Sequence, residues 1–261
     1  MMKEKLYQKA IELTNGKWSS VLLKRFTTSA ISKKIIPSYI DIYDIETGEV
    51  SKNMQSFTSL HDFFTRKLVS EARPIDHNPE MYVSPVDAKI ESFGTIENNT
   101  SFFVKGKTYD LVDLLGKEEH AKTFENGQYI VFYLSPRDYH RIHSPIDGKV
   151  VRQYTLGAKS YPVNGTGLTY GNKPISGNYR SVTELKTSSG AHCEVIKVGA
   201  MFVNSIQLTN TSDTWEKGEE VGYFTFGSTV VMIFEKNRAA FLENVVKDGR
   251  IRVGEAFAHM L

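Results

Sequence analysis

A seven-residue segment of the chain occurs twice, sixty positions apart. Ser84-Pro85-Val86-Asp87-Ala88-Lys89-Ile90 reappears as Ser144-Pro145-Ile146-Asp147-Gly148-Lys149-Val150. Each copy runs into a strand-like sequence, and Ser-Pro-x-Asp is typical of a turn, because Asp bonds its own backbone there. The repetition predicts two related turn–strand elements that pack in one body.

From about residue 80 the chain consists of short β-rich runs separated by Gly, Pro, Asn and Asp. Residues 129–134, 193–198 and 229–234 are rich in β-branched or aromatic side chains, which is typical of strands. Residues 161–177 are rich in turn formers and predict a long loop. No low-complexity linker divides the chain. We therefore expect an α+β fold, with one β-dominated body over residues 71–261 and a helical region over residues 1–70.

Residues 1–70 carry three apolar stripes at helical spacing, which predict amphipathic helices. The stripes comprise Leu6, Ala10 and Leu13; Trp18, Val21, Leu22 and Phe26; and Phe57, Leu60, Phe63, Phe64 and Leu68. Pro37 is expected to end the helical segment before it. Apolar faces beside lysines fit helices in a membrane interface, and they equally fit a helical cap docked on the main core. The sequence leaves both interpretations open.

Basic side chains gather at the N-terminus. Residues 1–36 hold eight basic and two acidic side chains, a balance of +6, which leaves −4 for the rest of a chain of net charge +2. A basic segment favours an anionic partner, and a membrane and a nucleic acid both qualify. No apolar run reaches the roughly 20 residues that span a bilayer, and the N-terminus lacks the pattern of a secretory signal. A membrane-bound form would therefore lie on the surface.

Cysteine and histidine usage argues against a metal centre. Cys193 is the only cysteine, which excludes an intramolecular disulfide and a zinc site built on paired cysteines. His140 and His143 could be paired ligands, but no further His, Cys or carboxylate follows at a recognisable spacing. We therefore expect no metal.

Reactive side chains occur in three segments. Asp87 lies in the first Ser-Pro-x-Asp turn, His140 and His143 follow an apolar run, and Ser228 lies near the C-terminus. A hydroxyl, an imidazole and a carboxylate are the parts of a nucleophile, base and orienter arrangement. Each also has a plain structural interpretation, with Ser228 as an ordinary strand residue and the aspartates of both turns as turn formers.

Six motifs together resemble the phosphatidylserine decarboxylase family. In chain order they are Phe63-Phe64-Thr65-Arg66-Lys67-Leu68 with Arg73-Pro74-Ile75; Ser84-Pro85-Val86-Asp87; Lys105-Gly106-Lys107 with Tyr109 to Gly116; Tyr139-His140-Arg141-Ile142-His143-Ser144-Pro145 with Tyr161-Pro162-Val163-Asn164; Val198-Gly199-Ala200 with Asn204-Ser205-Ile206; and Gly227-Ser228-Thr229. They follow the family's order over about 170 residues.

The resemblance implies a proenzyme that cuts itself between Gly227 and Ser228 into a large chain, 1–227, and a small chain, 228–261. The Ser228 hydroxyl would attack the Gly227 carbonyl in an N-to-O acyl shift. Gly227 would help because a residue without Cβ tolerates unusual backbone angles. Elimination would leave dehydroalanine, which hydrolyses to a pyruvoyl group and ammonia.

The resemblance also implies the roles of three other residues. Asp87 and His143 would assist the self-cleavage by Ser228, and His140 would serve in decarboxylation. The mature enzyme would convert phosphatidylserine to phosphatidylethanolamine and CO2 through a Schiff base on the pyruvoyl group, without a metal or an external cofactor. Two positions depart from the family's pattern: Phe226 stands where Leu is usual, and Ala88 where Gly is usual. The second raises the question whether the turn at Asp87 keeps its geometry.

The implied partners are phosphatidylserine in the bilayer and an anionic membrane surface, with no nucleic acid. The large and small chains would stay together, and the question of a homo-oligomer stays open. A phospholipid substrate and a basic N-terminus predict peripheral attachment to the cytoplasmic face of the cell membrane.

Two other functions fit parts of the sequence. A pyruvoyl-type decarboxylase for a soluble amine acid would share the serine chemistry and would need no membrane. A non-enzymatic carrier domain is suggested by the repeated turns, which resemble lipoyl-like hairpins. Such a carrier needs an exposed lysine for modification between symmetric hairpins, and the sequence has no Asp-Lys-Ala-like site.

Overall fold

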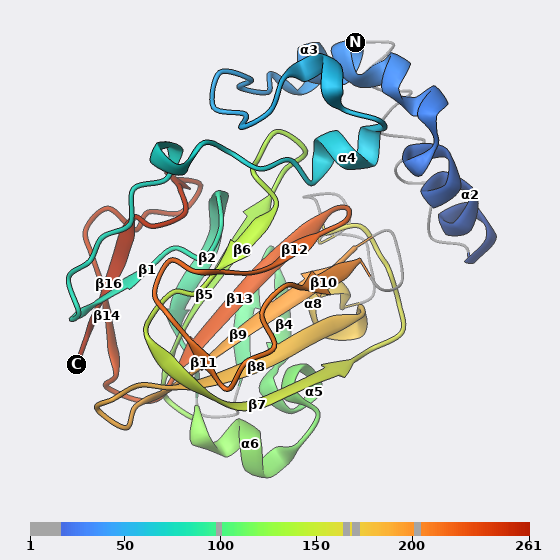
Figure 1. Cartoon of the computed structure of the whole chain (residues 1–261). Coiled ribbons are helices and arrows are strands. Elements are labelled where there is room, and N and C mark those ends of the chain that lie inside the picture. The colour runs from blue at the N-terminus through green and yellow to red at the C-terminus, as the bar shows by residue number, and fades with distance from the viewer. Residues whose placement is uncertain (1–16, 98–100, 164–167, 169–172, 201–204) are drawn as a thin grey trace.

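Figure 1 shows the computed structural model of the chain, which describes residues 17–97, 101–163, 168, 173–200 and 205–261, and of residues 17–20 the backbone only. A β-rich body forms the larger part, and the N-terminal helices lie together at one end of it. The predicted α+β class with a β-dominated body is confirmed. The lipoyl-like character of the hairpins stays a prediction.

An eight-stranded antiparallel sheet forms the centre of the body (Figure 1). Its strands, in spatial order, are β11 (Thr214–Trp215), β7 (Gly148–Leu156), β8 (Arg180–Lys186), β9 (His192–Gly199), β13 (Ser228–Phe234), β5 (Gln128–Leu134), β2 (Ala88–Thr95) and β15 (Arg250–Ile251).

Both faces of the central strand β13 are buried. Val230, Met232 and Phe234 pack in one hydrophobic cluster, and Val231 and Ile233 pack in another. Successive side chains of a strand point to opposite faces of the sheet, so the two clusters lie on opposite sides of β13. A strand buried on both faces needs apolar residues throughout, which explains the unbroken apolar run that predicted it.

Different elements cover the two faces. The first cluster includes residues from two three-stranded sheets. One sheet consists of β1 (Met81–Val83), β16 (Ala256–Met260) and β14 (Ala239–Phe241). The other consists of β10 (Ile206–Leu208), β12 (Glu220–Phe224) and β6 (Arg141–His143). The second includes the hairpin of β3 (Ser101–Val104) and β4 (Lys107–Asp110), with α5 (Leu111–Leu115), α6 (Glu118–Thr123) and α8 (Pro174–Gly177). The short helix α8 lies at the end of the segment predicted as a loop, part of which is outside the described residues.

The N-terminal helical region consists of short helices. They are α2 (Lys17–Thr28), η2 (Ala30–Ile35), α3 (Ile36–Tyr43), η3 (Met54–Ser56), α4 (Leu60–Phe64) and η4 (Ser70–Ala72). Pro37 lies in the first turn of α3, so the prediction that it ends a helical segment is wrong. A proline is tolerated there because the first backbone N–H groups of a helix have no intrahelical partner. Among the described residues, no helix is long and apolar enough to cross a bilayer.

The predicted apolar stripes have different environments. Phe57, Leu60, Phe63 and Phe64 of the third stripe are buried in a local cluster with α3, so they support the helical region from within. Most of the second stripe is exposed. The first stripe and the side chain of Trp18 lie outside the described residues.

The two copies of the Ser-Pro-x-Asp segment make matching hydrogen bonds. The hydroxyl of Ser84 donates to the carbonyl of Val86, and that of Ser144 to the carbonyl of Ile146, both at 2.7 Å. The copies also bond each other, because the N–H of Val83 donates to Pro145 and the N–H of His143 to Pro85. The predicted pair of related turn elements in one body is thus confirmed.

The turns also bind their aspartates alike. The Asp87 carboxylate accepts from the N–H of Val253, and that of Asp147 from the N–H of Lys217. Ala88 begins β2 and is not among the residues with positive φ, so this turn does not require the glycine that is usual there.

Candidate active site

Ser228 is the first residue of β13 and lies between two neighbouring strand ends. It pairs with Leu134, the last residue of β5, and with Gly199, the last residue of β9. Its side chain is fully buried, and its hydroxyl has no hydrogen-bond partner among the described residues. A buried hydroxyl without a partner costs free energy. Such a group calls for an explanation, and a catalytic role is one of those known for buried groups without partners.

A backbone hydrogen bond holds the carbonyl group before Ser228. The N–H of Ala200 donates to the carbonyl of Gly227 at 3.0 Å. An N–H that points at a carbonyl oxygen stabilises negative charge developing on that oxygen. Gly227 does not adopt positive φ, so the unusual backbone conformation expected for it does not occur in the uncut chain.

Ser228 lines a cavity of about 190 Å³. The cavity is contributed by α3, α4, the end of β5, the loop that follows it, and the segments around Val163, Ala200 and Gly227. Its lining is Tyr39, Tyr43, Phe64, Tyr133, Leu134, Pro136, His140, Pro162, Val163, Ala200, Phe226, Gly227 and Ser228. The N-terminal helical region therefore forms one wall of the cavity that contains the predicted nucleophile, and the residues present leave room for a small group beside it.

His140 is the imidazole of this cavity. Its Nδ1 lies 2.8 Å from the carbonyl oxygen of Asp138, which can only accept, so Nδ1 carries the proton and Nε2 has a free lone pair. The ring packs on Phe64 at a centroid distance of 4.0 Å, and Phe64 stacks on Phe226 at 5.2 Å. Complete burial, assisted by the charge of Arg66, lowers the pKa of His140 to about 3. His140 is therefore a neutral base at physiological pH.

His143 has a similar tautomer in a different environment. Its Nδ1 donates to the carbonyl of Gly218 at 2.7 Å, and its Nε2 lies 3.3 Å from the hydroxyl of Tyr139. Burial is the main cause that lowers the pKa of His143. A backbone carbonyl thus fixes this imidazole in the way a carboxylate would in a triad.

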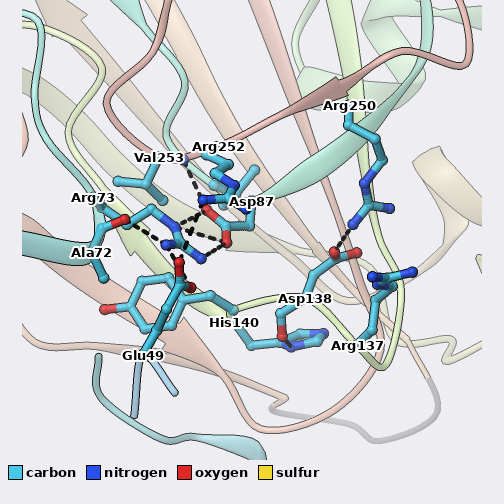
Figure 2. Close-up of polar contacts among 12 residues, drawn as sticks. Glu49, Ala72, Arg73, Asp87, Arg137, Asp138, His140, Arg250, Arg252 and Val253 are labelled. Carbon is cyan, nitrogen blue, oxygen red and sulfur yellow. Dashed lines mark hydrogen bonds and ion pairs between the residues drawn. The ribbon is translucent and has the colours of Figure 1, made fainter. Parts of the chain in front are cut away.

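Asp87 is bound by an arginine. Nε of Arg73 donates to both carboxylate oxygens at 2.8 and 2.9 Å, and the second guanidinium nitrogen lies 2.5 Å from Oδ2. Glu49 accepts from the other side of the same guanidinium at 2.8 Å. Figure 2 shows this cluster and the His140 ring apart from it, beside Asp138. Arg73 belongs to a motif of the family resemblance, but nothing in its spacing predicted this ion pair.

The structure thus brings together only some of the predicted site residues. His140, Gly227 and Ser228 share one cavity. Within the described part of the chain, no hydrogen bond joins any two of Asp87, His143 and Ser228. Asp87 and His143 are nevertheless near enough that the aspartate charge opposes the lowering of the histidine pKa.

A second, polar cavity of about 220 Å³ lies around Asp87. It is lined by Glu46, Glu49, Arg66, Leu68, Arg73, Asp87, Arg137, Asp138, Tyr139, Arg250, Ile251 and Arg252. Arg250 pairs with Asp138 there, as Figure 2 shows. Buried Arg66 has two guanidinium nitrogens, Nε and Nη1, without a hydrogen-bond partner in the described structure. Since guanidinium groups bind phosphate and carboxylate, this cavity could hold an anionic group.

The comparisons with known proteins agree on one family. The sequence profile described as "Phosphatidylserine decarboxylase" matches residues 60–259. Phosphatidylserine decarboxylase proenzymes of Bacillus thuringiensis subsp. konkukian (strain 97-27) and Bacillus cereus (strain 03BB102) are each 48% identical over 260 residues, covering 100% of this chain and 99% of theirs. The proenzyme of Bacillus mycoides (strain KBAB4) is 48% identical over 257 residues, 98% of each chain.

Lowering the pH is expected to destabilise the fold through His140. An unfolded histidine binds a proton near pH 6.5, whereas folded His140 stays neutral down to about pH 3. The unfolded state then binds more protons, so stability is lost as the pH falls below 6.5, by at most about 1.4 kcal/mol per unit. In the Ser228→Ala background, which keeps the chain whole so that unfolding can be reversible, His140→Asn should reduce the slope of unfolding free energy between pH 6.5 and 4.5 in urea denaturation. The exposed control His259→Asn should keep the wild-type slope, and an unchanged slope in His140→Asn would contradict this account.

Proposed function

The chain belongs to the phosphatidylserine decarboxylase family, and from this premise we propose that it is a proenzyme that cuts itself before Ser228 and then decarboxylates phosphatidylserine to phosphatidylethanolamine. One observation carries the proposal: the buried hydroxyl of Ser228, which has no hydrogen-bond partner within the described residues, shares a cavity with the neutral imidazole of His140. A serine is a weak nucleophile until a base takes its proton, and here a base is within the same cavity.

Self-cleavage would begin when Oγ of Ser228 attacks the carbonyl carbon of Gly227. The N–H of Ala200, 3.0 Å from the carbonyl oxygen, stabilises the charge that develops there. The C–N bond then breaks and leaves an ester between Gly227 and the serine oxygen. Loss of the α-proton of residue 228 expels the Gly227 carboxylate and leaves dehydroalanine. Water converts this enamine to a pyruvoyl group with release of ammonia.

The pyruvoyl group supplies an electron sink for the electrons that remain when CO2 leaves the substrate. The chain's own residues provide the surroundings. Phe64, Phe226 and Val163 give the cavity an apolar lining, which disfavours a carboxylate and favours its loss as neutral CO2. His140 is placed to hold a proton near residue 228 and to return it to the carbon that loses CO2.

We propose that His143 and Asp87 assist self-cleavage and that His140 acts in decarboxylation. This division requires that the three processing residues approach each other, because Asp87 is bound to Arg73 and His143 to Gly218 in the uncut chain. The position of His140 in the Ser228 cavity favours a second candidate, in which His140 is also the base for the cut.

Processing is expected to give two fragments. The large one covers residues 1–227, and the small one covers residues 228–261, blocked at its N-terminus because a pyruvoyl group has no amine. Intact mass spectrometry of purified protein should detect both. Ser228→Ala should remain a single chain of 29.5 kDa, whereas Ser205→Ala, a buried serine with an unpartnered hydroxyl, should still be cut. An active wild-type enzyme of full mass would contradict the proposal.

Variants of the two histidines separate their roles. His143→Ala should accumulate uncut chain, and His140→Ala should be cut but decarboxylate at least about 100-fold more slowly, the usual contribution of a general acid or base. Accumulation of uncut His140→Ala instead would assign the processing base to His140. Asp87→Asn should slow the cut more than Asp147→Asn, which changes the matching carboxylate of the other turn. Wild-type cutting by all four variants would show that none of these residues assists.

We further propose that the helical region binds the enzyme to an anionic membrane at the cytoplasmic face. An apolar patch of Val21, Leu22, Phe26 and Ile31 is exposed, with 66% of Leu22 and 69% of Ile31 accessible to solvent. Exposed Lys24, Arg25, Lys33 and Lys34 flank the patch, and each basic group near an anionic surface adds on the order of 1 kcal/mol to binding. α3 of the same helical region lines the Ser228 cavity, so the region proposed to bind lipid also contributes to the proposed reaction site.

Polar substitution of the patch is expected to weaken membrane binding and to spare self-cleavage. The double variant Leu22→Ser/Ile31→Ser should bind vesicles containing phosphatidylserine at least about 10-fold more weakly, because each fully buried side chain of this size contributes about 1.5–3 kcal/mol. Co-sedimentation measures binding, and a gel measures the cut. The control Val151→Ser/Val246→Ser, at exposed apolar positions elsewhere, should behave as wild type. Full binding by the correctly cut patch variant would move the membrane site to another surface.

A further inference from the structure

We infer that His120, Glu184 and Glu194 form a site for a divalent transition metal, for which zinc is the best fit. Each residue offers a ligand atom, these atoms all lie within 4.8 Å of one another, and all three residues are buried. The cluster lies where α6 covers β8 and β9, and no step of the proposed reaction uses it.

The two glutamates face each other across neighbouring strands. Glu184 of β8 is the register partner of Glu194 of β9, so their side chains leave the same face of the sheet side by side. Glu194 is completely buried, and neither of its carboxylate oxygens has a hydrogen-bond partner in the described structure. Like charges directly opposite each other destabilise a strand pair. A buried pair of this kind therefore needs a cation between its members.

His120 directs its Nε2 at these carboxylates, so this nitrogen can bind either a metal or a proton. The hydroxyl of Tyr154 donates to the carbonyl of Leu115 at 2.9 Å, so its oxygen accepts from Nδ1 of His120 at 3.0 Å. The remaining nitrogen, Nε2, lies 2.6 Å from Glu194 Oε1 and 3.3 Å from Glu184 Oε2, in neither case with hydrogen-bond alignment. Donation from the other ring nitrogen is the outer contact that orients metal-binding histidines.

Glu184 is oriented in a similar way. His192 Nδ1 lies 2.5 Å from Oε1, which leaves Oε2 directed at His120. The half-exposed guanidinium of Arg152 lies 3.2 Å from Oε2 of Glu184 and compensates part of the charge of that carboxylate. Glu194, in contrast, has no ion pair besides that with His120 in the described structure.

One imidazole and two carboxylates suit zinc better than calcium or magnesium, which prefer oxygen ligands throughout. Tetrahedral zinc with bonds of about 2.1 Å separates its ligands by about 3.4 Å. The 3.3 Å contact between His120 and Glu184 matches this spacing, and the 2.6 Å contact with Glu194 would lengthen when the ion enters. The fourth position would hold water.

A metal here would act on stability rather than on the reaction. Glu194 lies five residues before Gly199, the partner of Ser228, so it is about 16 Å along β9 from the cleavage point. An ion would fix α6 to β8 and β9, the second of which pairs with β13. A proton is the rival occupant, since the two carboxylates, against the effect of burial, raise the pKa of His120 to about 9.

Zinc binding to tag-free, full-length protein tests the inference. The protein is stripped with a chelator, titrated with zinc alone, and assayed for bound metal by elemental analysis and for its melting temperature. Wild type should bind one zinc per chain and melt at a higher temperature with zinc. Glu194→Gln, which keeps the volume and removes the charge, should bind at least 10-fold more weakly. The control Glu119→Gln, exposed on the same helix, should bind as wild type.

Tyr154→Phe provides a milder change should Glu194→Gln fail to fold. It removes only the hydroxyl that orients His120 and should weaken zinc binding about 10-fold. Self-cleavage on a gel reports whether each variant is folded, because the cut is expected to need an intact sheet. Wild type that binds no zinc, or a folded Glu194→Gln or Tyr154→Phe variant that binds it with unchanged affinity, would overturn the inference and leave the proton as occupant.

Discussion

The pairing of β13 with β5 and β9 is the interaction on which the rest of the structure depends. All seven residues of β13 have partners on both sides, and the strand is buried on both faces. The first of these paired residues is Ser228, so the sheet itself fixes the position of the hydroxyl. Gly199 ends β9 at the same point, and the chain that leaves it brings the N–H of Ala200 to the carbonyl of Gly227. The peptide bond that we propose is cut is thus oriented by the register of the strands on either side.

Backbone carbonyls, rather than carboxylates, orient both histidines of the Tyr-His-Arg-Ile-His segment. Asp138 and Gly218 supply these carbonyls, so both rings direct Nε2 away from the backbone. Nε2 of His140 has no partner among the described residues, whereas Nε2 of His143 contacts the hydroxyl of Tyr139. The carboxylate of Asp87 is instead part of an ion-pair cluster with Arg73 and Glu49. This cluster connects the helical region to the first repeat turn, and it makes Asp87 a structural residue of the uncut chain whatever it contributes to the cut.

Much of the fold and part of the site could be predicted from the sequence, for identifiable reasons. Strands buried on both faces are long apolar runs, as at 229–234, and a repeated turn sequence makes repeated hydrogen bonds. The serine and the histidines lie in dense local motifs, so their chemistry is visible along the chain. Contacts set by register or by chain crossing have no such signal. The amide of Ala200 meets the carbonyl of Gly227 only when the strands align, and Glu184 meets Glu194 for the same reason.

The helical region illustrates the same limit. The second predicted stripe lies on α2 and part of the third on α4, but spacing alone does not tell which stripe faces the interior. Phe57 and Phe63 are buried, whereas Leu22 is exposed, because α4 packs against α3 and one side of α2 stays uncovered.

The central position of β13 has a consequence for the lifetime of a cut molecule. Residues 228–261, 34 in number, contain β13, β14, β15 and β16, which are distributed over two sheets. A break before Ser228 removes one covalent link and leaves every strand pairing in place. A separated piece of this size could not bury a core of its own, and the large piece would lose the middle strand of its sheet. The two pieces would then keep the fold that formed before the cut, and they could not form it again after they separate. Durability of the mature form would be governed by the rate at which it opens, not by an equilibrium between folded and unfolded chains.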